Sequence, residues 1–254
     1  MQGTNGAAVQ QFFPLSMDAN EGDSREEGDK QWYGDDHLWI VQAVSAYLKE
    51  TGDYEFLSEG ITYYSKERPL EEREEGTVLD HLKRALAFSK TNTGAQGLPL
   101  LGFADWNDCV NLQGDAESVM IANLYGRALL EMIELMDYTG DDVAAANYRA
   151  DHAEMKKVMN ESVWDGEWFM RYFEADGTPI GSNQNSEGKI YTNAQSWSVF
   201  AGFADEERAK QALDSVHDKL NTPRGIKISW PGYNGFDPSK GGITTYPPGA
   251  KEDG

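Results

Sequence analysis

Residues 103–112 read Phe-Ala-Asp-Trp-Asn-Asp-Cys-Val-Asn-Leu, and this stretch separates two segments of helical periodicity, 77–88 and 116–138. It follows a turn that contains glycine and proline at residues 97–102. A tryptophan offers a flat apolar face to a sugar ring, and an asparagine offers a donor and an acceptor to its hydroxyls. A carboxylic acid beside such a ring can protonate a glycosidic oxygen. The stretch therefore predicts two helices joined by a loop that can act on carbohydrate.

The rest of the chain repeats this alternation of helical segments and turn-rich loops. Apolar residues recur at helical spacing in segments that begin near residues 36, 77, 116, 142, 195 and 205. Residues 164–173 change to a period of two and lead into Asp176-Gly177, which predicts a β-hairpin. Residues 1–34 and the final 30 residues are rich in turn formers and predict long loops. We expect a mainly α fold with functional loops and one small hairpin.

Composition and charge narrow the class of protein. The 254-residue chain can bury a sizeable core and can form one large domain. Its net charge of −21 opposes binding to nucleic acid or to anionic membrane surfaces, so we expect neither as a partner. No apolar run approaches the roughly 20 residues of a membrane span. The single cysteine, Cys109, excludes an intrachain disulfide and favours a reducing compartment, so we expect a cytoplasmic protein. The four histidines lack the spacing of metal ligands, and we expect no metal.

The tetrad Asp-Trp-Asn-Asp at residues 105–108 is accompanied by four further blocks of sequence. They are Gly34-Asp35-Asp36-His37-Leu38-Trp39, Glu50-Thr51-Gly52-Asp53, Asn193-Ala194-Gln195-Ser196-Trp197 and residues 230–254, which begin Trp-Pro-Gly-Tyr-Asn-Gly-Phe-Asp. In their order along the chain, the five blocks resemble those of the cellobiose phosphorylase family, glycoside hydrolase family 94. The resemblance covers nearly the whole chain.

The resemblance implies a fold and an activity. Members are inverting phosphorylases of β-linked disaccharides and short oligosaccharides such as cellobiose, cellodextrins or chitobiose, and they release a sugar 1-phosphate reversibly. Inorganic phosphate is a co-substrate and no cofactor is implied. The chain resembles part of the catalytic (α/α)6 toroid, over residues 1–254, truncated at both ends and without the family's N-terminal β-sandwich domain. The phosphate-binding residues are then expected outside the chain, and the parent protein is expected to be a homodimer.

The resemblance also implies roles for single residues. The last Asp of the tetrad, Asp108, is the implied general acid. Trp106 is expected to line the subsite of the donor sugar, with Asn107 also in contact with substrate. Asp105 is expected to shape the turn or to accept a sugar hydroxyl. A second group, in the block at the end of the chain, is implied to contact the acceptor sugar: Tyr246, Lys251 and Glu252.

Several alternatives stay open from the residues alone. Asp108 could cap a turn, as aspartates commonly do, and Trp106 could belong to a core. Asp35 and Asp36 suit the N-terminus of a helix, which favours acidic side chains, and we assign them no chemistry. The chain could also belong to an inverting glycoside hydrolase, which needs a second carboxylate, or be an inactive sugar-binding fragment. We expect the isolated chain to be inactive.

Overall fold

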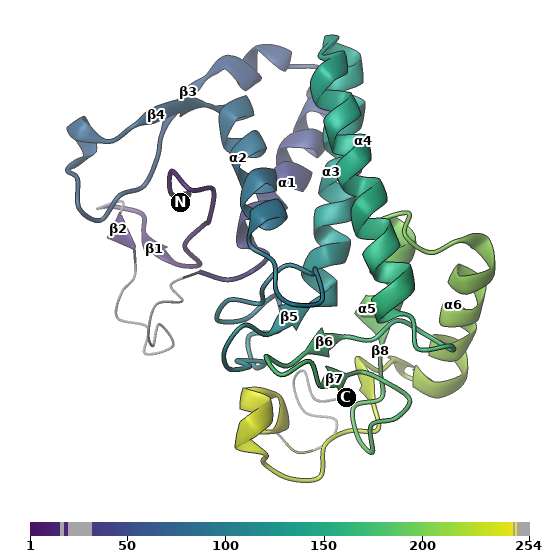
Figure 1. Cartoon of the computed structure of the whole chain (residues 1–254). Coiled ribbons are helices and arrows are strands. Elements are labelled where there is room, and N and C mark those ends of the chain that lie inside the picture. Colours follow the sequence, from purple (N-terminus) through teal and green to yellow (C-terminus); the bar gives the residue numbers. More distant parts are fainter. Residues whose placement is uncertain (16–17, 20–31, 246, 248–254) are drawn as a thin grey trace.

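The computed structural model describes residues 1–15, 18–19, 32–245 and 247. The expected acceptor residues Tyr246, Lys251 and Glu252 lie outside the described residues. The described part is mainly helical, as predicted (Figure 1). Its α-helices are α1 (Asp36–Thr51), α2 (Val78–Thr91), α3 (Val119–Thr139), α4 (Asp142–Val158), α5 (Thr192–Phe200) and α6 (Glu206–Leu220).

The ends of the helices follow from capping residues that the sequence supplies. The hydroxyl of Thr77 accepts the N–H of Asp80 at the start of α2, and Gly52 ends α1 in the left-handed conformation. The helix α3 begins three residues later than the predicted start at Ala116. Residues 117–118 pair as a strand, and the Ser118 hydroxyl then caps the helix. The apolar spacing typical of a helix therefore begins before the helix itself.

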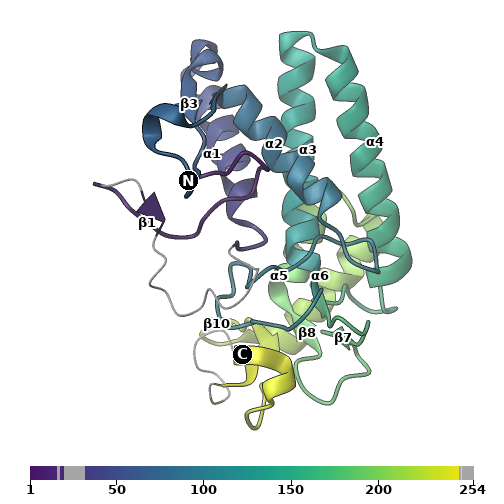
Figure 2. The same cartoon turned by 60° about the vertical axis from the view of Figure 1, so that its left-hand side comes forward.

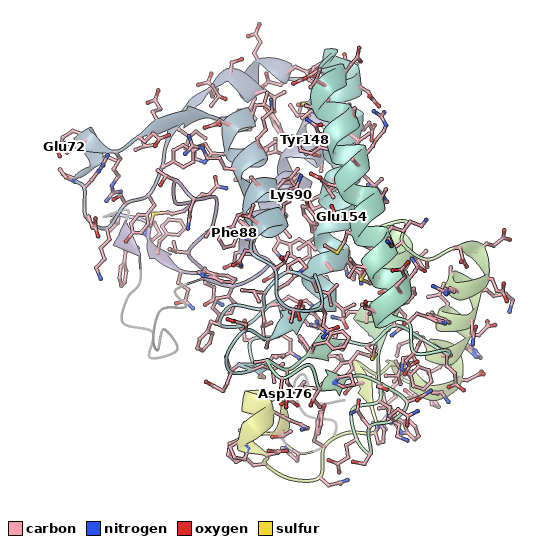
Figure 3. All side chains as sticks on the ribbon, in the orientation of Figure 1. Glu72, Phe88, Lys90, Tyr148, Glu154 and Asp176 are labelled. Atoms are coloured by element: carbon pink, nitrogen blue, oxygen red, sulfur yellow. The ribbon has the colours of Figure 1, made fainter. Side chains whose placement is uncertain are left out.

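The helices α1 to α4 run alongside one another and alternate in direction (Figures 1 and 2). The central helix is α3, which packs on α1, α4 and α5 and is buried over most of its length. Lys90 of α2 and Tyr148 of α4 lie where these two helices face each other, and Lys90 bonds Asp151 of α4 at 2.6 Å (Figure 3). This alternation brings the N-termini of α1 and α3 to the same end of the bundle, where the long loops gather.

Short strands organise those loops. The predicted hairpin is present as β6 (Tyr172–Phe173) and β7 (Pro179–Ile180), and β5 (Glu117–Ser118) extends it to three strands. The other ladders pair β1 (Phe12–Phe13) with β2 (Asp18–Ala19), β3 (Gly60–Thr62) with β4 (Glu75–Thr77), β8 (Ile190–Tyr191) with β11 (Ser229–Trp230), and β9 (Asn221–Thr222) with β10 (Gly225–Ile226). Short helical segments lie at η1 (Tyr54–Ser58), η2 (Leu70–Glu72) and η3 (Met159–Val163).

Near the end of the described residues, the segment 238–244 packs against the stretch 103–112. Its helical turn η4 (Pro238–Thr244) contains two glycines, and the structure explains both. A Cβ at Gly241 would lie 2.1 Å from the carbonyl oxygen of Val110, and one at Gly242 would lie 2.3 Å from that of Cys109. On its other side, η4 lies beside the hairpin turn at Asp176, and Lys240 pairs with Glu174 at 3.5 Å (Figure 3). The backbones of two distant segments therefore touch at this end of the bundle.

Candidate functional site

The stretch Phe103–Leu112, here called the site loop, begins with hydrogen-bonded backbone. The N–H of Phe103 bonds the carbonyl of Trp32 at 3.1 Å, and the carbonyl of Ala104 accepts the N–H of Gly34 at 2.9 Å. In the turn before the loop, the N–H groups of Gln96 and Leu98 donate to the buried carboxylate of Glu117 at 3.0–3.1 Å. The loop is thus tied to the start of α1 and to β5 before its polar residues are reached.

Side chains in the tetrad alternate between the interior and the solvent. Asp105 and Asn107 are 0% and 1% exposed, whereas Trp106 is 37% exposed and Asp108 is also exposed. Two hydrogen bonds set this alternation. Asp105 Oδ1 accepts the N–H of Asn107 at 3.0 Å, and Asn107 Oδ1 accepts the N–H of Cys109 at 3.1 Å. The inward residues therefore hold the backbone on both sides of Asp108.

Beneath the loop, Asp105 lies in a closed set of donors. Nη2 of Arg171 donates to both carboxylate oxygens, at 2.9 and 2.7 Å. The hydroxyl of Ser118 donates to Oδ2 at 2.7 Å and that of Tyr172 to Oδ1 at 3.2 Å. All four side chains are buried. With the N–H of Asn107, both carboxylate oxygens are fully engaged by protein donors.

The charges of this network compensate each other. Burial alone would lower the pKa of the Arg171 guanidinium, but the Asp105 carboxylate outweighs burial and the pKa is raised. Burial raises the pKa of the Tyr172 hydroxyl well above its usual value, so it stays a donor. Arg171 also lies over the Tyr172 ring, 3.8 Å from its centroid. Asp105 and Arg171 therefore form an ion pair in the interior whose charges offset each other.

A second pair of carboxylates comes from the start of α1. Asp35 is 1% exposed, and its Oδ2 accepts the Trp39 indole N–H at 2.7 Å. Burial, followed by the negative charge of Asp105, raises the pKa of Asp35 to about 8. Asp35 lies directly before α1, at the helix N-terminus where it was expected. Its side chain makes no capping bond, and it is mostly protonated at neutral pH.

Asp36 faces the exposed side of the same junction. Burial, followed by the negative charge of Asp108, raises the pKa of Asp36 to about 6, and the N-terminal amine opposes this shift. Asp36 and Gln10 line one cavity of about 810 Å³, and Gln10 Nε2 donates to Asp108 Oδ1 at 3.4 Å. Asp36 Oδ2 has no hydrogen-bond partner among the described residues. Asp36 and Asp108 are therefore close enough to influence each other's charge.

The structure places the expected site residues in two groups. Trp106 and Asp108 reach the surface together, as a substrate contact and a general acid require. Asp105 does shape the turn, but its other expected role, as an acceptor of a sugar hydroxyl, is not compatible with a buried and fully bonded carboxylate. Asn107 is likewise buried, with its amide oxygen used inside the loop. Both inward residues are structural partners of the outward ones.

Arg171, Ser118 and Tyr172 were not singled out from the sequence. A signal for Arg171 was present, since it is the only charge in the apolar run 168–173, and a charge in such a run needs a buried partner. No pattern identifies that partner as Asp105, which lies 66 residues away. Among the described residues, no group of three or more His, Cys, Asp or Glu side chains is arranged to hold a metal ion. No helix in the described part is long and apolar enough to cross a membrane.

Comparison with protein families matches residues 2–254 to the model of the glycosyl hydrolase 94 superfamily, catalytic domain. The chain belongs to this superfamily. The match covers nearly all of the sequence and includes the site loop, the start of α1 and the C-terminal block. Membership agrees with the resemblance noted from the sequence, and it assigns the helices to part of a catalytic helical toroid.

Relatives within the glycosyl hydrolase 94 superfamily include characterised phosphorylases. The chain is 36% identical to solabiose phosphorylase of Paenibacillus borealis over 230 residues, which are 89% of the chain and 29% of that protein. It is 32% identical to N,N'-diacetylchitobiose phosphorylase of Vibrio proteolyticus over 243 residues, 95% of the chain and again 29% of the relative. The chain thus spans less than a third of the length of these relatives.

Among solved structures, the chain is similar to a GH78 family rhamnosidase of Bacillus sp. GL1. The TM-score is 0.55 at 17% sequence identity, over 78% of this chain and 18% of the other. Identity at this level shows a shared fold and nothing about substrate. The similarity is therefore one of fold alone.

Proposed function

We propose that this chain carries the general acid of an inverting glycoside phosphorylase. The substrate is a β-linked disaccharide or short oligosaccharide of the cellobiose, cellodextrin or chitobiose kind, and inorganic phosphate is the co-substrate. The observation that carries the proposal is the exposure of Asp108 and Trp106 side by side on a loop anchored from below. Membership of the superfamily and the names of its relatives support the reaction class.

In the proposed reaction, protonated Asp108 donates its proton to the bridging oxygen as the glycosidic bond breaks. A phosphate oxygen forms the new bond to the anomeric carbon from the opposite face, so the configuration inverts and a sugar 1-phosphate results. Phosphate is already an anion, and no carboxylate is needed to activate it. In the reverse direction the Asp108 carboxylate accepts the proton of the acceptor hydroxyl.

Trp106 and the C-terminal block are proposed to hold the two sugars. The indole ring of Trp106 is partly exposed beside Asp108 and can lie against the apolar face of the donor ring. The turn η4, which packs on the backbone of Cys109 and Val110, ends at Thr244, two residues before Tyr246. This contact supports a role for Tyr246, Lys251 and Glu252 on the acceptor side of the cleaved bond.

Other elements of the proposal concern the whole protein. We propose that residues 1–254 form part of the catalytic toroid, and that the phosphate-binding residues lie elsewhere in the full-length protein. A homodimer in the cytoplasm is the corresponding cellular form. Sedimentation of the full-length protein tests the oligomeric state, and a monomer at working concentration would contradict it.

Hydrolysis is the competing reaction, because Asp36 is a second carboxylate within electrostatic reach of Asp108. An inverting hydrolase uses its second carboxylate to activate water, with the two carboxyl groups about 6.5–9.5 Å apart. The products separate the two reactions. With phosphate present, a phosphorylase releases a sugar 1-phosphate, and without phosphate it releases almost nothing. Equal release of free sugar with and without phosphate would favour the hydrolase.

Replacement of the acid tests the assignment itself. Asp108→Asn in the full-length protein is expected to lower phosphorolysis of the preferred disaccharide by about 10²–10⁴-fold, the range for loss of general acid catalysis. Release of sugar 1-phosphate from cellobiose, N,N'-diacetylchitobiose and related disaccharides is the measurement. Near-normal turnover by this variant would remove Asp108 from the mechanism.

The acceptor side has its own test. Replacement of Lys251 or Glu252 with Ala is expected to raise the acceptor KM by up to about a hundredfold, since a lost bond to a charged group weakens binding by about 1.5–3 kcal/mol. The KM for the sugar 1-phosphate should change little. Initial rates in the synthetic direction, with each substrate varied in turn, give both constants. A rise confined to the donor KM would place the block at the other subsite.

A further inference from the structure

Arg171 is a buried cation that the proposed reaction does not use directly. It is 1% exposed and is among the largest side chains that are fully buried in the described part of the chain. Its backbone directly precedes β6: the N–H bonds the carbonyl of Ile180 at 2.8 Å, and its carbonyl accepts the N–H of Val119 at 3.1 Å. The guanidinium group therefore projects from a fixed support toward the underside of the site loop.

The contacts of Arg171 suit a guanidinium and no other side chain. Nη2 bonds both oxygens of Asp105, and Nη1 bonds the hydroxyl of Ser118 at 3.1 Å. That hydroxyl in turn donates to Asp105 Oδ2, so three side chains close a ring of hydrogen bonds. A lysine presents one compact ammonium group and cannot reproduce the two planar nitrogens. The position of the Asp105 carboxylate is therefore set by Arg171 in direction as well as in charge.

From Asp105 the contacts continue to both neighbours of Asp108. The carboxylate accepts the N–H of Asn107, and the Asn107 side chain accepts the N–H of Cys109. Asp108 lies between these two anchored residues, and its own side chain reaches the surface. A shift of the Asp105 carboxylate thus moves the backbone that carries Asp108, although Arg171 itself is buried.

From this geometry we infer that Arg171 is a positioning residue for Asp108, acting through Asp105 and Asn107. The inference rests on the proposed function, in which Asp108 protonates the leaving oxygen. Proton transfer requires the donor oxygen within hydrogen-bond reach of the bridging oxygen, and misplacement by about 1 Å can lower a rate about a hundredfold. Arg171 then affects the proton-transfer part of the reaction more than the attack by phosphate.

Leaving groups distinguish this role from a merely structural one. A sugar alkoxide must be protonated as the glycosidic bond breaks, whereas 2,4-dinitrophenolate leaves as a stable anion without a proton. Phosphate attack on the anomeric carbon is common to both substrates. A misplaced acid therefore slows the disaccharide and has little effect on the 2,4-dinitrophenyl β-glycoside of the same donor sugar. A protein that is only less well folded loses activity on both alike.

The experiment uses Arg171→Lys in the full-length protein. Phosphate-dependent kcat is measured with the disaccharide that the wild type cleaves fastest, and with the 2,4-dinitrophenyl β-glycoside of its non-reducing sugar. We expect a loss of about 10- to 100-fold on the disaccharide, the range for a displaced catalytic group, and less than about threefold on the aryl glycoside. Equal losses on the two substrates would overturn the inference.

Two further variants guard against loss of folding. The double variant Asp105→Leu with Arg171→Met removes both charges together, a replacement that buried ion pairs often tolerate, and also removes the acceptor for the N–H of Asn107. It should show the same selective loss. The matched control is Arg208→Met, because Arg208 is a partly buried arginine that bonds Asn160 at 2.6 Å, away from the site loop. Its effect on the two substrates should be equal.

Asp108→Asn is the reference for the leaving-group pattern. If it slows the disaccharide selectively and the Arg171 variants do not, the positioning role is wrong and the proposed function stands. If Asp108→Asn itself shows no selectivity, the assignment of the acid fails, and the positioning role fails with it. A selective loss in the reference and in both Arg171 variants supports the inference.

Discussion

Asp105 and Asp108 are the same residue type in the same loop, yet their surroundings are opposite. Asp105 is 0% exposed and accepts bonds from Arg171, Ser118 and Tyr172. Asp108 is exposed, and its Oδ1 accepts a hydrogen bond from Gln10, which lines a cavity. A carboxylate whose oxygens are filled by buried donors anchors the backbone, while an accessible one can exchange a proton. The comparison separates an anchoring carboxylate at one end of the tetrad from an exposed one at the other, to which we assign the proposed chemistry.

The same division appears at the start of α1. Asp35 faces inward, near Asp105, and Asp36 faces the cavity near Asp108. Each element therefore contributes one fully buried carboxylate and one less buried carboxylate to a single junction. Net charge at this junction depends on Arg171, which neutralises Asp105, and on burial, which keeps Asp35 protonated. Four substitutions test whether the inward and outward members really differ.

The largest expected effect is on stability. Asp105→Asn leaves the Arg171 guanidinium buried beside a neutral partner, and loss of one member of a buried ion pair destabilises by about 3–5 kcal/mol. Asp108→Asn alters an exposed group and should change stability by less than about 0.5 kcal/mol. Urea unfolding of both variants measures the difference. Similar free energies of unfolding for the two would mean that the inward and outward carboxylates are equivalent.

The second expected effect separates Asp35 from Asp36 by pH. The pKa of Asp35 in the folded protein, about 8, lies above the usual 3.8, so the folded state holds a proton that the unfolded state has lost. Its contribution to stability is fully present below pH of about 4 and decreases up to pH of about 8, by at most about 1.4 kcal/mol per pH unit. Asp35→Asn has no carboxyl group at this position, so it does not lose stability in this way. The variant should therefore be more stable than the wild type throughout that pH range.

Asp36→Asn is the matched control for that measurement. With a folded pKa of about 6, its contribution should stop changing near pH 6, two units before that of Asp35. Free energies of unfolding from pH 4 to 9 give the two curves. Parallel curves for Asp35→Asn and the wild type would show that the Asp35 carboxyl is not enclosed as described.

The smallest expected effect concerns the pH dependence of activity. Asp36 is mostly ionised at neutral pH, and its negative charge disfavours loss of the proton from a nearby acid. Asp36→Asn should therefore move the basic limb of the kcat/KM profile to lower pH, by less than about one unit for a partly screened charge. Asp35→Asn removes no charge at that pH and should leave the limb in place. A shift to higher pH would reverse the sign of this interaction.

Local sequence signals predicted most of the helices because their causes are local. Thr77 and Asp205 cap the helices that follow them, and each predicted helical segment corresponds to a helix in the structure. The start of α3 was placed early because residues 117–118 carry apolar neighbours in the same period, while their strand pairing depends on residues 172–173. The hairpin was predicted at its turn, and the third strand was not, for the same reason.

The amino-acid sequence by itself determined the order of the helices, the position of the site loop and, through five blocks, the family of the chain. Tertiary structure alone decided which carboxylates of the tetrad and of the α1 start are enclosed. Asp105 and Asp108 carry equal local signals, and they differ only because Arg171 and Ser118 arrive beneath one of them from other elements. Burial and long-range pairing set the charge and freedom of a carboxylate, and neither is encoded in its immediate neighbours.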